Sequence, residues 1–219
     1  MDGTIVDTEP LWMAAETRMV ESFGGSWTYD DALQLVGKGL EDSADILRAA
    51  GVQREVDDIV QSLTAEVAAE LRGGAAVFRP GAVELLQELR RSGIRTGLVT
   101  MSLRSMADSV IDLLEDAAFD VIVTGDTSRR PKPFPDPYLQ AAEALGIDIA
   151  EAVVIEDSPS GLRSGVASGA VTLGVPHMVS LEGLGADALW PTLEGRRVAD
   201  LAALYTTHRR VSAQAATRA

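Results

Sequence analysis

The first third of the chain carries apolar residues at helical spacing. The clearest stripe recurs every four residues and consists of Ile59, Leu63, Val67 and Leu71. From residue 11 to about residue 72 the pattern is helical, and no segment has the pattern of a strand. Gly73 and Gly74 interrupt the stripe, so we expect a structural boundary there.

After Pro80 the pattern changes to helices that alternate with short apolar strands. The predicted helices cover residues 81–92, 103–114, 136–145 and 159–167. The predicted strands cover residues 94–100, 119–123, 152–155 and 171–175. This alternation is typical of a parallel sheet covered by helices on both faces. We therefore predict a Rossmann-like α/β fold, in which ligands bind where the strands end. Residues 206–219 show no periodicity, and we expect a loose tail there.

Composition narrows the class of protein. A chain of 219 residues with 46% hydrophobic residues can bury a core. The formal charge of -14, from 33 acidic and 19 basic residues, argues against nucleic acid or an anionic membrane as partner. The chain has no cysteine, which excludes disulfides, zinc-thiolate sites and thiol catalysis. No apolar run is long enough to span a membrane, and acids occupy the first ten residues where a signal peptide would be basic and apolar. We expect a cytoplasmic protein, as a monomer or a weak homodimer.

Four short segments contain candidate chemistry. In chain order they are Asp2-Gly3-Thr4, Thr100, Lys132 in a proline-rich loop, and Glu156-Asp157. Each also has an ordinary explanation, since Asp157 could cap the following helix and Lys132 could be a solvated charge. Thr100 and Glu156-Asp157, however, come directly after predicted strands, where ligands bind in such folds.

Taken together, the order and spacing of these segments resemble the four motifs of the haloacid dehalogenase phosphatases. The resemblance covers nearly the whole chain and is nearest to the phosphoglucomutase-like and phosphoglycolate phosphatase-like subgroup. It implies a magnesium-dependent phosphatase that hydrolyses a small phosphorylated metabolite, such as a sugar phosphate, through an aspartyl-phosphate intermediate. A hard, oxygen-binding cation suits this reaction because a carboxylate and a phosphate repel each other.

The resemblance also implies a role for each matching residue. Asp2 would be the general acid and base. The phosphate would be bound by Gly3, Thr100, Met101 and Lys132. Mg²⁺ would be held by Asp2, Glu156 and Asp157.

The helical stretch matches the family's small cap domain in place and length. On this basis we expect residues 1–10 and 76–219 to form the core and residues 11–75 to form the cap. Lys38, in the cap loop, is a candidate substrate contact, and Glu16 or Arg18 could also reach the site. Leu40 stands where related sugar phosphomutases carry an arginine, which favours hydrolysis over the mutase reaction.

The chain departs from the family at its first residue. The family's nucleophilic aspartate stands two residues before Asp2, one position before Met1. We therefore expect the N-terminus to be truncated, the central first strand to be largely missing, and this exact chain to be inactive as written. Three alternatives stay open: a non-catalytic remnant of the family, a sugar phosphomutase, and a haloacid dehalogenase, whose chemistry uses no magnesium.

Overall fold

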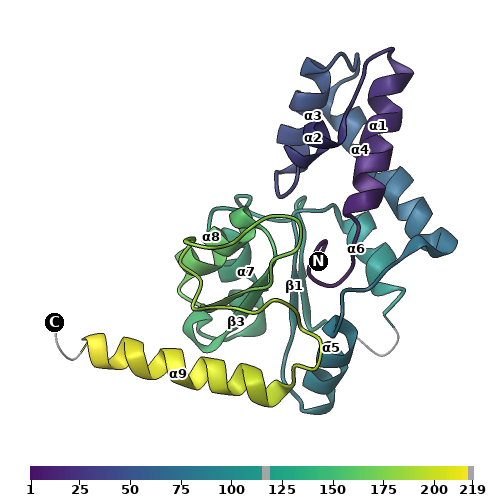
Figure 1. Cartoon of the computed structure of the whole chain (residues 1–219). Helices are drawn as coiled ribbons and strands as arrows, with labels where there is room; N and C mark the ends of the chain where they lie inside the picture. The colour runs from purple at the N-terminus through teal and green to yellow at the C-terminus, as the bar shows by residue number, and fades with distance from the viewer. Residues whose placement is uncertain (115–118, 217–219) are drawn as a thin grey trace.

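The computed structural model describes residues 1–114 and 119–216, with side chains up to residue 209, and contains a helical region and an α/β region (Figure 1). The helical region stands away from the strands. It contains α1 (Glu9–Ser22), α2 (Tyr29–Leu33), α3 (Leu40–Ala49) and α4 (Val56–Glu70). Helix α4 runs into the π-helical turn η1 (Leu71–Ala75), where Gly74 has a φ of 96°. The predicted helical stretch and its glycine break are confirmed.

The α/β region follows the predicted alternation of elements. Its helices are α5 (Ala82–Arg91), α6 (Arg104–Ile111), α7 (Asp136–Leu145), η2 (Ile149–Glu151), α8 (Pro159–Ser168) and α9 (Val198–Ala216). Its strands are β1 (Gly97–Val99), β2 (Val121–Val123), β3 (Val153–Glu156), β4 (Val171–Gly174) and β5 (Ala188–Leu189). Strands β1, β2 and β4 are shorter than the apolar runs that predicted them, because only part of each run is paired.

All strand pairs are parallel, which confirms the predicted α/β class. Strand β1 pairs with β2, and β4 lies between β3 and β5. Helices α7 and α8 begin with prolines in their first turns and end at Gly146 and Gly169, which adopt left-handed backbone conformations. These local signals bound the two helices that flank β3 in the chain.

An apolar cavity of about 380 Å³ separates the two sheets. Residues 97–99 of β1 and 153–155 of β3 line it, together with Met1 and Ile5. Within the described ranges no strand joins β1 to β3, and residues 1–8 form only isolated bridges, such as that between Asp2 and Val6. This agrees with the expectation that the central first strand is largely missing.

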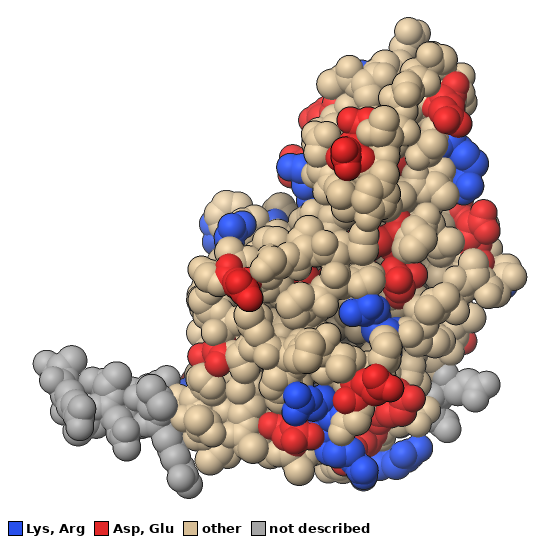
Figure 2. All heavy atoms as spheres, viewed as in Figure 1, with Lys and Arg blue, Asp and Glu red and all other residues tan. Residues whose placement is uncertain are grey.

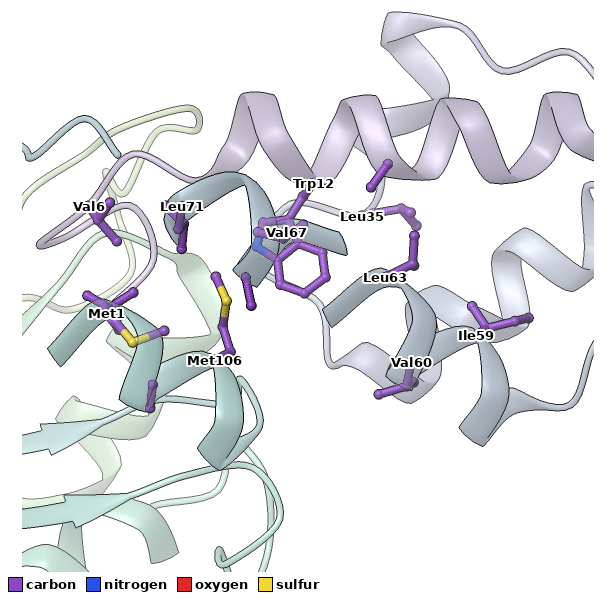
Figure 3. Close-up of a cluster of buried hydrophobic side chains, with 14 of the residues drawn as sticks. Met1, Val6, Trp12, Leu35, Ile59, Val60, Leu63, Val67, Leu71 and Met106 are labelled. Atoms are coloured by element: carbon purple, nitrogen blue, oxygen red, sulfur yellow. The ribbon is translucent and has the colours of Figure 1, made fainter. Parts of the chain in front are cut away.

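One hydrophobic cluster connects the helical region to the α/β region (Figure 3). It runs from Met1 and Met106 in the core to Leu71 and Val67 on η1 and α4, and on to Trp12 on α1. Leu71 and Met106 are fully buried. Because both regions contribute to one cluster, α1 is held at a fixed position above the strand ends.

The C-terminal segment differs from the sequence-based expectation. Residues 206–219 were expected to form a loose tail, but helix α9 continues to Ala216, and residues 217–219 lie outside the described part. Val198, Leu201 and Leu204 recur at helical spacing and pack with Leu85 of α5. The segment after Tyr205 extends a helix that packing has already started, so it needs no apolar stripe of its own.

Among the helices that the structure describes, none combines the length and the apolar character that crossing a membrane requires.

We predict that Gly81→Ala destabilises the fold by about 2–4 kcal/mol, because it combines an unfavourable left-handed backbone with overpacking. Gly81 precedes α5 with a φ of 79°, and a Cβ atom there would overlap the backbone carbonyl of Leu193. Gly183 has a φ of 73° but open space around it, so Gly183→Ala should lose only about 1–2 kcal/mol. Denaturant unfolding measures both losses. Equal losses would show that the close approach to Leu193 contributes nothing.

Candidate active site

A polar cleft lies where the carboxyl ends of β1 and β3 meet the helical region. Its volume is about 130 Å³, and its walls come from α1, the loop between α2 and α3, and the strand ends. Seven sequence-predicted residues line it: Asp2, Lys38, Thr100, Met101, Lys132, Glu156 and Asp157. The motifs therefore converge in space as well as in order.

Asp2 is oriented by two hydroxyl groups. Ser102 donates to Oδ2 of Asp2 at 2.6 Å, and Thr8 donates to Oδ1 at 2.7 Å. Both donors are buried residues. These bonds hold the carboxylate in one orientation, which a residue that passes protons to a bound substrate requires.

Gly3 makes room for Asp157. It has a φ of 67°, and a Cβ atom on it would overlap the Asp157 carboxylate. The neighbouring Thr4 hydroxyl donates to Oδ1 of Asp157 at 2.6 Å. Gly3 lies against Asp157 and is not among the residues that line the cleft, and its expected contact with the phosphate stays a prediction. Residue 3 has to be glycine because its backbone lies so close to the Asp157 carboxylate.

A buried ion pair joins the third and fourth motifs. Lys132 Nζ lies 2.5 Å from Oε1 of Glu156 and donates to the carbonyl of Val99 at 3.0 Å. The two side chains are 8% and 6% exposed. Tyr138, on α7, donates its hydroxyl to the same Glu156 oxygen. Burial by itself would raise the pKa of Glu156, but the Lys132 ammonium and these hydrogen bonds hold it below its ordinary value.

Excess negative charge surrounds Asp157. Burial, and then the nearby charge of Glu156, raise the pKa of Asp157 to about 6. No three acidic or histidine side chains of the described residues converge as a ready-made metal site. Oδ2 of Asp157 lies against Gly3, and Oε2 of Glu156 lies against Gly161 and accepts from the Ser158 hydroxyl at 3.3 Å. A divalent cation fits this donor set because it would compensate the charge with oxygen ligands.

Thr100 and Met101 form the loop that follows β1. Thr100 is buried, and its hydroxyl oxygen accepts from the backbone N–H of Ser102 at 3.1 Å. Among the described residues its hydroxyl hydrogen has no acceptor, so it can donate to a ligand. The sulfur of Met101 accepts from the backbone N–H of Lys132 at 3.3 Å, which ties this loop to the lysine loop.

The helical region closes the other side of the cleft. Lys38 lies on the loop between α2 and α3, and Ser160, on α8, donates to the carbonyl of the adjacent Gly37 at 2.7 Å. Glu16 reaches the cleft. Arg18 does not, because it forms surface ion pairs with Glu66 and Glu70.

Sequence reasoning missed one face of α1. Glu9, Trp12 and Met13 line the cleft beside Glu16. Their spacing of three, four and seven residues places them on one side of the helix. Acidic residues on an otherwise apolar helix face were the sequence signal that could have revealed this part of the cleft. Burial is the main reason that the pKa of Glu9 rises to about 7, followed by the charges of Asp2 and Asp157. Burial, and then the charge of Glu9, raise the pKa of Glu16 to about 8.

Acidic and basic side chains are interspersed over the face shown in Figure 2. Inside the cleft, positive charge comes from individual lysine side chains, and Lys132 is the lysine that is buried.

Comparison with known proteins gives a consistent picture. Residues 1–175 match the family model described as haloacid dehalogenase-like hydrolase. The chain is 30% identical over 185 residues to a phosphorylated carbohydrates phosphatase of Thermotoga maritima, covering 82% of this chain and 84% of that protein. It is 31% identical over 176 residues to hexitol phosphatase A of Escherichia coli, covering 80% of each. The crystal structure of CbbY from Rhodobacter sphaeroides in complex with phosphate superposes with a TM-score of 0.81 at 27% identity, covering 91% of this chain and 95% of that one.

We predict that Glu16→Gln weakens the pH dependence of folding stability between about pH 5 and 8. The pKa of Glu16 rises from 4.5 to about 8 in the folded protein. The folded state therefore binds this proton more tightly, so the stabilisation is complete below pH 4.5 and is lost as the pH rises towards 8. The glutamine has no proton to lose, and the variant should be more stable than the parent at pH 8.

Denaturant unfolding across this pH range measures the effect. Glu21→Gln, at an exposed position of the same helix, is the matched control and should leave the pH dependence unchanged. Parallel curves for the parent and Glu16→Gln would contradict the assigned pKa shift.

Proposed function

The chain belongs to the haloacid dehalogenase-like hydrolases, and we propose that it is a phosphatase that hydrolyses small phosphate monoesters with the help of Mg²⁺. The observation that supports this most strongly is the buried Lys132–Glu156 pair beside Asp2 and Asp157 in one cleft. The names of two relatives, a phosphorylated carbohydrates phosphatase and a hexitol phosphatase, point to phosphorylated sugars or polyols as substrates.

In this proposal the phosphoryl oxygens lie between β1 and the lysine loop. The Lys132 ammonium and the Thr100 hydroxyl donate to them, and the residue 101 backbone completes the cradle. Glu156 orients Lys132 through their contact at 2.5 Å. These donors stabilise the charge that shifts onto the phosphoryl oxygens during transfer.

Asp2 acts as the general acid and general base. Protonated, it gives its proton to the leaving oxygen of the ester, and the resulting carboxylate then accepts a proton from the attacking water. The hydroxyls of Ser102 and Thr8 support both states because each can rotate to donate or to accept.

Asp157, together with Asp2 and Glu156, would hold Mg²⁺. When bound, the ion would offset the repulsion between the carboxylates and the phosphate. Gly3 and Thr4 keep Asp157 in place for this role. Burial first, and then the charge of Glu156, raise the pKa of Asp157, and a bound cation would offset both effects.

In the family motif the attacking carboxylate stands two residues before the aspartate that Asp2 matches. The N-terminal amine of Met1 is near enough to Asp157 to lower its pKa, so a residue joined to Met1 would lie near Asp157. A sugar phosphomutase is a weaker candidate, because Leu40 lines the cleft where related mutases carry an arginine.

A cytoplasmic location and a monomeric or weakly dimeric state stay predictions.

We predict phosphate release from hexose and hexitol phosphates in the presence of Mg²⁺ when an apolar strand and an aspartate precede Met1. In that form Lys132→Ala should lower turnover by about 10²–10³-fold or more, because a preorganised donor to the phosphoryl group is lost. The chain as given is assayed beside it and should show little release. Near-parental turnover by Lys132→Ala would remove this residue from the site, and an isomerised sugar phosphate without phosphate release would indicate a mutase.

We predict that Asp157→Asn weakens Mg²⁺ binding about tenfold or more, because the amide supplies a neutral oxygen in place of a charged one. Isothermal titration with MgCl₂ measures the affinity. Asp7→Asn is the control, since Asp7 lies in the first motif but pairs with His177 outside the cleft. Unchanged affinity in Asp157→Asn would argue against the proposed metal position.

A further inference from the structure

The helical region contacts the α/β region in two places. In the first, the hydrophobic cluster that contains Trp12, Leu71 and Met106 joins the two regions (Figure 3). In the second, the loop between α2 and α3 reaches the first turn of α8 (Figure 1). The first contact is apolar and the second is polar. They can therefore be altered separately.

The polar contact joins two backbone turns at the cleft. The hydroxyl of Ser160 donates to the carbonyl of Gly37 at 2.7 Å. Gly37 has a φ of 75°, and a Cβ atom on it would lie 3.3 Å from Cβ of Ser158. The loop backbone therefore lies directly against the turn that follows Asp157. A further hydrogen bond between the two regions, from Arg72, lies at η1, where the chain returns to the core.

Ser160 is not needed to start its own helix. Ser158 caps α8, because its side chain accepts from the backbone N–H of Gly161 at 3.2 Å. The hydroxyl of Ser160 instead leaves the helix and reaches the helical region. This bond is therefore available for a function other than helix capping.

The loop that Ser160 holds carries part of the cleft wall. Gly37, Lys38 and Leu40 line the cleft from the helical side, and Ser160 lines it from the core. Lys38 is exposed and forms no ion pair within the described part of the chain. A lysine side chain has many rotamers, so the place that its ammonium reaches depends on where the backbone is held.

We propose that Ser160 is a positioning residue, whose hydroxyl holds residues 36–39 over the cleft and so presents Lys38 to the leaving group of the ester. This rests on the proposed phosphatase function and concerns how that site selects its substrate. The donors to the phosphoryl group, Lys132 and Thr100, belong to the core. A leaving group extends from the phosphate to the loop, whereas inorganic phosphate stays at the strand ends. Ser160 therefore strengthens the binding of the ester and not of phosphate alone.

The test compares ligands with and without a leaving group. The full chain with Mg²⁺ is titrated calorimetrically with glucose 6-phosphate, glucitol 6-phosphate and inorganic phosphate. Ser160→Ala should weaken the binding of the esters about three- to tenfold, as the net contribution of one hydrogen bond implies, and leave the affinity for inorganic phosphate unchanged. Adding Ser160→Ala to Lys38→Ala should cause no further loss, because Ser160 acts through Lys38.

Two control variants separate positioning from a structural role. Ser168→Ala removes another hydroxyl on α8, which donates to the carbonyl of Gly165 at 2.6 Å, and should leave all affinities unchanged. Ser160→Thr keeps a hydroxyl and should restore the binding of the esters.

Three results overturn the inference and leave the phosphatase proposal intact. The first is unchanged binding of the esters by Ser160→Ala, or esters that the parent binds no better than phosphate. The second is an equal loss for the esters and for phosphate, which indicates a structural effect. The third is a full additional loss in the Lys38→Ala background. If neither the esters nor inorganic phosphate bind to the parent, the proposed function and this inference fall together.

Discussion

The buried ion pair between Lys132 and Glu156 is the interaction on which the cleft depends. It connects the lysine loop to the end of β3, and Lys132 also bonds to the carbonyl of Val99 at the end of β1. Two buried charges are costly unless each is paired and hydrogen-bonded, and here Tyr138 supplies a further donor to Glu156. The pair therefore fixes the distance between two sheets that share no ladder in the described structure, and it keeps one cation at the phosphate end.

The helical region adds the second constraint. Because Trp12, Val67 and Met106 belong to one hydrophobic cluster, α1 cannot move away from the core without exposing apolar surface. The face of α1 that carries Trp12 also turns Glu9 and Glu16 towards the motif residues. Core packing thus determines which acids face the substrate, although neither acid takes part in the packing itself.

The sequence predicted those features that depend on local patterns. The parallel α/β fold was predicted from short apolar runs and from proline or glycine signals. The position of the cleft was predicted from motifs that lie at strand ends. It could not predict that Gly3 serves Asp157, because that contact joins residues at opposite ends of the chain. The extent of α9 was also missed, since tertiary packing starts this helix before its own pattern weakens. On the cleft face of α1 only Glu16 was named from the sequence, and Glu9 was missed because an acid on a helix is usually solvated.

The two ends of the cleft make opposite demands on a ligand. At the strand ends, Lys132 and the Thr100 hydroxyl favour an anion, and Asp157 favours a metal ion that accompanies it. At α1, burial and then the charge of Glu9 raise the pKa of Glu16. A ligand that fits the cleft therefore has to place its anionic group at the strand ends and away from the acids of α1.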